Sequence, residues 1–333
     1  MRLHKTLSVA LALLVCALGA QSAMAADVKT LAKPQQISDA LEATIHAAGP
    51  DGVQVAEEQL NLWCPGYQAP GVSANGCIVA PSGCTANFIY SDGSDWQTNP
   101  YVGTASHCVD KVGEPVIMQV DTTTLAEVGT VYKKTADEDP GDDFAIIRVY
   151  PEVAQKWGVN PRIPTGGPQG IYTECNPQAV KSYGHGYGVT VAQGKPQGGY
   201  APDWWSDAYG WFGVGIFGDS GSGVTLLDNR SAGNFTHIIV FDPSFGYKPG
   251  ELAGMRTTRI LEFLGAGWSQ VNADGSLSRA TNAPCPAYDD GGSGSGGKGP
   301  KDDKGPKGDK GPKGDKGPKR NGSKGNGWNA EAL

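Results

Sequence analysis

The pattern of apolar and polar positions gives the chain a long middle portion with many short apolar runs. Clusters of glycine, proline, asparagine and aspartate separate these runs from one another. Many short strands punctuated by such turn residues are typical of an all-β sandwich or barrel. We therefore expect strands at residues 88–90, 116–118, 128–132, 144–149, 224–227 and 237–241.

Two segments show the spacing of a helix instead. Apolar residues recur at every fourth position from Ile37 to Ile45, and Gly49-Pro50 ends this pattern. A second, short helix is expected over residues 258–264, directly before a glycine. The first helix belongs either to the surface of the folded protein or to a pro-segment that is removed.

The first residues of the chain have the character of an export signal. A basic start precedes an apolar run over residues 7–18, and the Ala-Met-Ala sequence at 23–25 has the small residues that a signal peptidase reads. The run is shorter than the roughly 20 residues needed to cross a bilayer. Cys16 lies inside the run rather than at its end, which disfavours a lipid anchor. We therefore predict a signal peptide at 1–25 and a secreted protein, extracellular or periplasmic, without a membrane span.

Composition divides the remaining chain into three parts. Residues 26–62 form a possible pro-segment or N-terminal extension. Residues 63–288 have the length of two small packed barrels, with a boundary near 165–178. Residues 289–333 begin as a glycine–serine linker and continue with lysine-rich triplets that carry glycine at every third place, as collagen does. So few triplets predict a disordered basic tail that contacts acidic surfaces, rather than a triple helix.

Charge and cysteine content narrow the kinds of partner. The formal net charge is −7 although the tail is basic, so the folded part is acidic and a nucleic-acid partner is not expected. Of the 7 cysteines, all but Cys16 follow the signal peptide, and an even number in an exported chain indicates disulfides. No CxxC pair is present, and we expect neither a metal nor another cofactor. The cysteines that remain are Cys64, Cys77, Cys84, Cys108, Cys175 and Cys285.

Three blocks of residues carry the candidate chemistry, and the first contains His107. Among the histidines after the signal peptide, His107 alone lies among small residues and directly before a cysteine, in the block 104–108. A disulfide between Cys84 and Cys108 would tie two adjacent strands and clamp this histidine beside a cleft. An imidazole in such a place can serve as a general base.

The second block is the acidic pair Asp142 and Asp143, which runs directly into the apolar segment 144–149. The carboxylate that orients a catalytic imidazole has to be buried, and Asp143 adjoins the apolar strand more closely than Asp142. The neighbouring acids at 137–139 are expected to form a solvated loop, because their spacing fits no EF-hand calcium site. Asp143 is therefore the predicted orienting residue.

The third block, GDSGSG at 218–223, predicts a nucleophile at Ser220. Its glycines let the backbone turn tightly, so that the N–H groups of Gly218 and Ser220 can form an oxyanion hole. Ser222 is the weaker nucleophile candidate, because it lacks the Gly-Asp pair that precedes Ser220. The block also differs from the GxSxG turn of α/β-hydrolases, since a serine stands two residues after the nucleophile.

Taken in this order, the blocks TASHC, DDFAII and GDSGSG resemble the signatures of the chymotrypsin/trypsin-like serine proteases. Segments 182–186 and 249–258 are similar to two further stretches of that family, and the resemblance covers about residues 75–270. It implies an all-β fold of two six-stranded antiparallel β-barrels, a chymotrypsin-like double barrel, with a short C-terminal helix. It also implies a catalytic triad in the cleft between the barrels. The triad residues are His107, Asp143 and Ser220.

The chain departs from trypsin-like members of the family at the substrate pocket. Val214 stands six residues before the nucleophile, where an acidic residue would select lysine or arginine, so a small or apolar P1 residue is expected. Ile216 replaces the usual pocket cysteine, and no IVGG-like new amino terminus is present to pair with Asp219. His237 and Phe241 are the other candidate substrate-binding residues, with a purely structural role in the strand as the alternative for His237.

These observations predict a secreted serine endopeptidase that hydrolyses peptide bonds through an acyl-enzyme intermediate, with a peptide or protein as its substrate. Two alternatives stay open on the sequence alone. One is a catalytically weak or inactive binding protein on the same scaffold, held to a surface by the basic tail. The other is an esterase that uses the same triad.

Overall fold

The computed structural model describes most of the chain between residues 36 and 280. The predicted signal peptide at 1–25, the candidate pocket residue Phe241 and most of the predicted tail at 289–333 lie outside the described residues. The described residues are 36–66, 69–136, 139–187, 194–239, 251–280, Cys285 and, for the backbone alone, 330–332.

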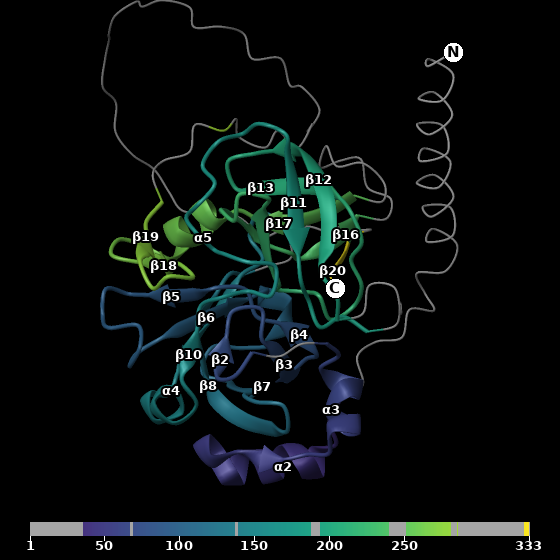
Figure 1. The fold of residues 1–333 in the computed structure, drawn as a ribbon, viewed down its shortest axis with the longest axis vertical. Coiled ribbons are helices and arrows are strands. Elements are labelled where there is room, and N and C mark those ends of the chain that lie inside the picture. Colours follow the sequence, from purple (N-terminus) through teal and green to yellow (C-terminus); the bar gives the residue numbers. More distant parts are fainter. Residues whose placement is uncertain are drawn as a thin grey trace, which may run out of the picture.

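The first of two large antiparallel sheets lies in the lower part of Figure 1. Its strand order is β19-β18-β5-β6-β9-β8-β7-β3-β4, with β1 beside β8. Buried side chains such as Val102, Phe144 and Ile146 form the interior of this first barrel. Its strands are β1 (Val53–Gln54), β3 (Cys77–Ala80), β4 (Cys84–Thr85), β5 (Ile89–Ser91), β6 (Tyr101–Thr104), β7 (Pro115–Gln119), β8 (Thr124–Lys134), β9 (Ala145–Val149), β18 (Ser269–Val271) and β19 (Leu277–Ser278).

The second sheet lies above the first and curls in the same manner (Figure 1). Its strand order is β15-β14-β11-β12-β13-β17-β16-β20, and its interior contains Tyr209, Trp211 and Phe235. Its strands are β11 (Gln178–Ser182), β12 (Gln197–Trp204), β13 (Ala208–Phe212), β14 (Gly223–Leu226), β15 (Ser231–Asn234), β16 (His237–Ile239), β17 (Glu251–Met255) and β20 (Ala330–Ala332). A separate parallel pair joins β2 (Val72–Ser73) to β10 (Val159–Asn160).

The all-β double-barrel class expected from the sequence is confirmed, and each predicted strand overlaps an observed one. Both sheets also carry short strands in addition to the six expected of each barrel. Several of these, such as β1, β4 and β19, are two residues long. An alternation of apolar and polar residues needs about four residues to become visible, so the sequence could not predict them.

The helices lie at the edges of the two barrels. Helices α2 (Asp39–Ala48) and α5 (Thr257–Leu264) confirm the two predicted helical segments, and Gly49 ends α2 as expected. Helices α3 (Glu57–Trp63) and α4 (Pro151–Trp157) were not predicted, because seven residues are too few for a helical period to stand out. None of the helices in the described part of the chain has the length and apolar character needed to cross a membrane.

The described part of the predicted N-terminal extension packs against the outside of the first barrel. Ile45 of α2 and Leu60 of α3 share a buried apolar cluster with Leu125 of β8. A disulfide joins Cys64, directly after α3, to Cys77 in β3. Residues 36–64 are therefore attached to the first barrel by both apolar packing and a covalent bond.

Candidate active site

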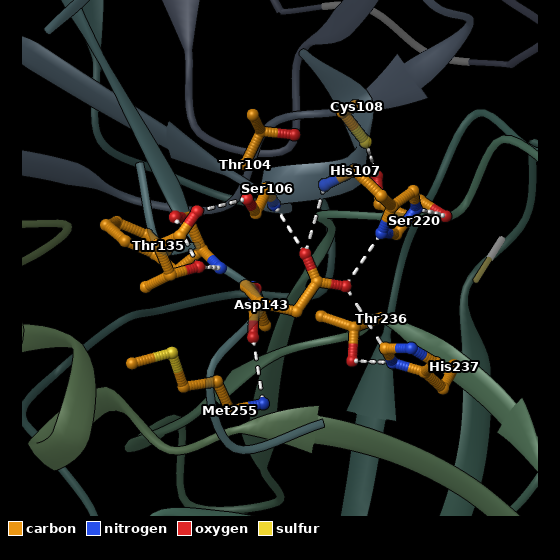
Figure 2. A network of polar contacts seen from close by, with 12 residues as sticks. Thr104, Ser106, His107, Cys108, Thr135, Asp143, Ser220, Thr236, His237 and Met255 are labelled. Atoms are coloured by element: carbon orange, nitrogen blue, oxygen red, sulfur yellow. Dashed lines mark hydrogen bonds and ion pairs between the residues drawn. The ribbon is translucent and has the colours of Figure 1, made fainter. Parts of the chain in front are cut away.

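His107 and Asp143 lie just beyond the adjacent ends of two paired strands of the first barrel, and their side chains meet in Figure 2. Thr104 at the end of β6 pairs with Ala145 at the start of β9, so the segments beyond these ends lie side by side. His107 follows in a short 3-10 helix, and its Nδ1–H donates to Asp143 Oδ2 at 2.7 Å. The other carboxylate oxygen, Oδ1, accepts the backbone N–H groups of Ser106 at 2.6 Å and His107 at 3.1 Å.

Asp143 is fully buried, yet its surroundings favour the carboxylate form. Burial raises the pKa of Asp143, but the charge and hydrogen bonds of His107, together with the charge of His237, outweigh burial and hold this pKa below its usual value. The backbone carbonyl of Asp143 accepts a hydrogen bond from Asn234 Nδ2 at 2.9 Å, which connects it to the second barrel. Asp142, the alternative residue, is partly exposed and lies 4.0 Å from Arg259. The geometry thus brings Asp143, and not Asp142, to the imidazole.

Ser220 reaches the imidazole from the second barrel. It lies in the turn that leads into β14, and its hydroxyl donates to His107 Nε2 at 2.8 Å. Both ring nitrogens of His107 are therefore engaged, one by the carboxylate of Asp143 and one by the hydroxyl. Ser220 is buried, whereas the His107 side chain keeps 17% of its surface exposed. The three residues form a continuous hydrogen-bonded chain that solvent can reach at the imidazole.

A hydrogen bond to the peptide between Phe217 and Gly218 fixes the orientation of the Gly218 N–H group. The carbonyl oxygen of Phe217, in the same peptide, accepts a hydrogen bond from Tyr187 N at 2.8 Å. In a trans peptide the N–H points away from the carbonyl, so this bond fixes the direction of the Gly218 N–H. Gly218 has a φ of 97°, a backbone conformation that favours glycine.

The N–H group of Ser220 is fixed in the same way. The carbonyl oxygen of Asp219 accepts a hydrogen bond from Ser222 N at 2.9 Å, which directs the Ser220 N–H to the opposite side of that peptide. Within the described part of the chain, neither this N–H nor that of Gly218 donates to a protein acceptor. Two oriented donors beside a hydroxyl have the composition of an oxyanion hole.

Asp219 has partners that the sequence did not reveal. Its Oδ1 accepts the backbone N–H of Gly186 at 2.8 Å, and its Oδ2 accepts that of Ile216 at 3.1 Å. Burial raises the pKa of Asp219 to about 7, because the two N–H groups offset only part of the cost of removing the charge from water. In the family pattern a new amino terminus would pair with Asp219. In this structure the backbone N–H groups of Gly186 and Ile216 pair with it.

The disulfide between Cys84 and Cys108 lies next to His107 and Ser220. It joins β4 to the 3-10 helix of His107, with a Cα–Cα distance of 6.1 Å, and Cys108 Sγ lies 3.9 Å from the carbonyl oxygen of Ser220. Cys84, His107 and Cys108 form the one group of potential metal ligands found among the described residues. Because both sulfurs are bonded to each other, neither is a thiolate that could bind a metal.

The structure describes two of the three candidate pocket residues, Val214 and His237, and they differ in how far they are buried. Val214 is half-buried in the loop after β13. His237, at the start of β16, keeps only 1% of its surface exposed, and its Nδ1 contacts Thr236 Oγ1 at 2.8 Å. The same nitrogen lies 3.8 Å from Asp143 Oδ2, the oxygen that also contacts His107, and the two imidazole rings lie edge to face with their centroids 6.1 Å apart (Figure 2). A substrate-binding role for Val214, His237 and Phe241 stays a prediction.

Thr85 is a site residue that the sequence did not reveal. Its hydroxyl donates to the carbonyl oxygen of Gly218 at 2.7 Å, and its backbone N–H donates to that of Ser220 at 2.8 Å. The first barrel thereby holds both residues of the candidate oxyanion hole. The one signal in the sequence is the position of Thr85 directly after Cys84, whose disulfide adjoins His107.

Comparison with known proteins gives similarity at the level of the fold. No protein-family model and no curated protein matches the chain. A chymotrypsin from Cellulomonas bogoriensis has 18% sequence identity and a TM-score of 0.38, with 60% of this chain and 97% of that chain covered. The inactive form of the Rv3671c protease has 18% identity and a TM-score of 0.32, with 55% of this chain and 84% of that chain covered. The chemistry of the site is therefore argued from the geometry of its own residues and not from these similarities.

Proposed function

We propose that the protein is a secreted serine endopeptidase that hydrolyses peptide bonds in proteins or peptides. The observation that carries this proposal is the unbroken hydrogen-bonded chain from Asp143 through His107 to Ser220, beside two oriented backbone donors. Acyl transfer requires a nucleophile, a base, a carboxylate that orients the base, and donors for the oxyanion. His107, Asp143, Ser220 and the two backbone donors are the candidates for these roles, and their hydrogen bonds support the proposal.

In the first half of the proposed reaction, Ser220 Oγ attacks the carbonyl carbon of the scissile peptide while its proton passes to His107 Nε2. Asp143 holds the Nδ1–H and stabilises the positive charge that forms on the ring. The N–H groups of Gly218 and Ser220 bind the oxyanion, and loss of one such donor typically raises the barrier by about 2.7–4 kcal/mol. His107 then gives its proton to the leaving nitrogen, the C–N bond breaks, and an ester to Ser220 remains.

In the second half, water hydrolyses this ester. His107 Nε2 takes a proton from the water as its oxygen attacks the ester carbon, and the oxyanion forms again at the same donors. The bond to Ser220 Oγ breaks, and His107 returns the proton to that oxygen. His107 thus carries every proton that moves in the cycle, and the proposed reaction consumes one water for each peptide bond.

The proposed substrates have a small or apolar P1 residue. Val214 supports this preference, because its apolar side chain stands where an acidic side chain would be needed to bind lysine or arginine. Cleavage of a peptide library, with the P1 residue varied, tests the preference. Dominant cleavage after lysine or arginine would overturn it.

Secretion is proposed together with the activity. Three disulfides join cysteines across the folded part, Cys64 to Cys77, Cys84 to Cys108 and Cys175 to Cys285. Disulfides of this kind persist in oxidising compartments, which agrees with the signal-like start of the chain. Mass spectrometry of the protein recovered from the medium or periplasm tests whether it is exported and where its amino terminus lies.

Covalent labelling with a fluorophosphonate tests the nucleophile. Wild-type protein is expected to form an adduct at Ser220, and Ser220→Ala is expected to lose both the adduct and peptide hydrolysis. Ser222→Ala is a matched control, because Ser222 is also a buried serine of the same block but lies outside the hydrogen-bonded chain. Absence of an adduct at Ser220 in folded wild-type protein would contradict the proposal and favour the binding-protein alternative.

A further inference from the structure

Residues 185–187, called the amide clamp below, lie against residues 216–220, called the oxyanion turn. Two backbone N–H groups of the amide clamp donate directly to the oxyanion turn. Gly186 N donates to the carboxylate of Asp219 at 2.8 Å, and Tyr187 N donates to the carbonyl of Phe217 at 2.8 Å. The bond from Tyr187 N to the Phe217 carbonyl is the one that fixes the direction of the Gly218 N–H, one of the two candidate oxyanion donors.

The third N–H group of the clamp acts through Thr85. His185 N donates to the hydroxyl oxygen of Thr85 at 2.9 Å, and this hydroxyl donates in turn to the carbonyl of Gly218 at 2.7 Å. Three successive amides of the clamp therefore converge on the oxyanion turn. The position of the turn depends on the position of the clamp.

The side chain of His185 anchors the clamp on its other side. The ring is buried, and its Nδ1 and Nε2 lie 3.0 Å from the carbonyl oxygen of Pro65 and 2.9 Å from that of Asn75. A neutral imidazole donates to one of these oxygens and an imidazolium to both. Glycines flank the ring at 184 and 186, where a Cβ atom would collide with the carboxylate of Asp219. The backbone at His185 is thus pressed against the turn while its ring points away from it.

Both carbonyls that contact the ring belong to segments that are tied to neighbouring parts of the fold by a disulfide or by side-chain hydrogen bonds. Pro65 follows Cys64, whose disulfide to Cys77 ties this segment to β3. Asn75 uses its side chain to accept from Gly223 N at 2.8 Å and to donate to the carbonyl of Tyr183 at 2.7 Å. The ring of His185 therefore connects the N-terminal segment to the clamp, and the clamp to the oxyanion turn.

We infer that His185 is a positioning residue for the oxyanion hole, and that the segment Cys64–Pro65 is the support that holds it in place. This inference rests on the proposed function, since it concerns the same reaction. Oxyanion donors act through their placement at the reacting carbonyl, and a displacement of about 1 Å can cost about 100-fold in rate. A change at His185 is thus expected to reduce kcat without removing a contact to substrate.

The test compares two substitutions of His185 on the best peptide substrate of the wild type. His185→Phe keeps a ring but removes both polar atoms, and kcat per titrated Ser220 is expected to fall about 10- to 100-fold with KM unchanged. His185→Gln retains a donor and is expected to recover part of this loss. A merely structural role would instead lower the thermal unfolding temperature while kcat per titrated serine stayed at the wild-type value, and that result would overturn the inference.

A pair of disulfide variants tests the support itself. Replacing both Cys64 and Cys77 by serine removes the covalent support next to Pro65. This double variant is expected to have a lower kcat, as His185→Phe is. Replacing Cys175 and Cys285 by serine removes a disulfide away from the clamp and is the matched control, expected to lower the unfolding temperature but to leave kcat unchanged. If His185→Phe does not fold, this pair decides the question, and equal kcat values for the two disulfide variants overturn the inference.

The outcomes also separate this inference from the proposed function. Wild-type protein without Ser220-dependent hydrolysis would overturn both. Active wild-type protein with unchanged kcat in the folded His185 variants would overturn the positioning role alone.

Discussion

Asp143 and Asp219 are two aspartates buried in the same site, and their pKa values move in opposite directions. Both carboxylates accept two or more hydrogen bonds with at least one from the backbone. Asp143 also faces the imidazole of His107, whereas the two hydrogen bonds recorded for Asp219 come from the N–H groups of Gly186 and Ile216.

The difference teaches that burial alone does not decide the protonation of an acid in this site. Burial raises both pKa values, and at Asp143 the effect is reversed by the charge and hydrogen bonds of His107 together with the charge of His237, whereas Asp219 has only backbone N–H groups among the causes that lower its pKa. The carboxylate form of Asp143 is thereby favoured, as the proposed reaction requires when His107 takes up a proton. Asp219 has a different task, which is to hold two backbone amides and so shape the turn.

Replacement of Asp143 by asparagine should have the largest effect on the reaction. An amide in this place cannot stabilise the imidazolium and favours the wrong tautomer of His107, so kcat is expected to fall about 10⁴-fold. Steady-state kinetics on a peptide substrate measures the loss. Asp142→Asn is the control and should retain wild-type kcat, because Asp142 lies outside the hydrogen-bonded chain; a similar loss in both variants would contradict the assignment.

Replacement of Asp219 by asparagine should have a smaller effect. The amide group can accept from only one of Gly186 and Ile216, so one side of the turn loses its support and kcat is expected to fall about 10- to 100-fold. KM should change little, because the Asp219 side chain is buried and both of its oxygens accept backbone N–H groups. A loss as large as that of Asp143→Asn would mean that Asp219 takes part in proton transfer and that the two acids do not differ in task.

The two substitutions should also change the pH dependence of stability in opposite directions. A raised pKa in the folded state stabilises it at low pH, so the stability contributed by Asp219 is fully present below about pH 4 and lost as pH rises through about 7. The lowered pKa of Asp143 contributes stability above about pH 4 that is lost as pH falls. Denaturant unfolding of wild type and both asparagine variants at several pH values measures these slopes, and slopes of the same sign would refute the comparison.

Chemical acetylation of the α-amino group should have no effect on kcat. The two partners recorded for Asp219 are backbone amides, so the turn does not require a free amino terminus. Kinetics before and after acetylation, with the modification confirmed by mass spectrometry, measures the difference. A large loss of kcat in the modified protein would show that the amino terminus supports the turn after all.

The local features of this site could be predicted from sequence, and the long-range ones could not. The blocks around His107, Asp143 and Ser220 stand out because small residues, an acid and glycines occur together over a few positions. Their meeting depends on the register of β6 against β9 and on the approach of the two barrels. The motif order suggests this arrangement but contains no distances.

The supporting residues leave almost no trace in the sequence. Thr85 and His185 act through contacts with residues far along the chain, and a single threonine or histidine has no local pattern. His237 was expected beside the substrate pocket, and only the structure shows its ring against Asp143. Sequence periodicity reflects local structure and contains no information on contacts between segments that are far apart along the chain.

The division of the site between two barrels has a consequence for control of the reaction. In the proposed reaction, the proton of the Ser220 hydroxyl would cross from the second barrel to the first over a single 2.8 Å hydrogen bond. No covalent bond among the described residues directly joins His107 to Ser220 across this seam; the nearby disulfide lies within the first barrel. If the proposed reaction is correct, a slight separation of the two barrels would break this hydrogen bond while each barrel stayed folded, so the activity would depend on how the barrels are packed and not only on the three residues themselves.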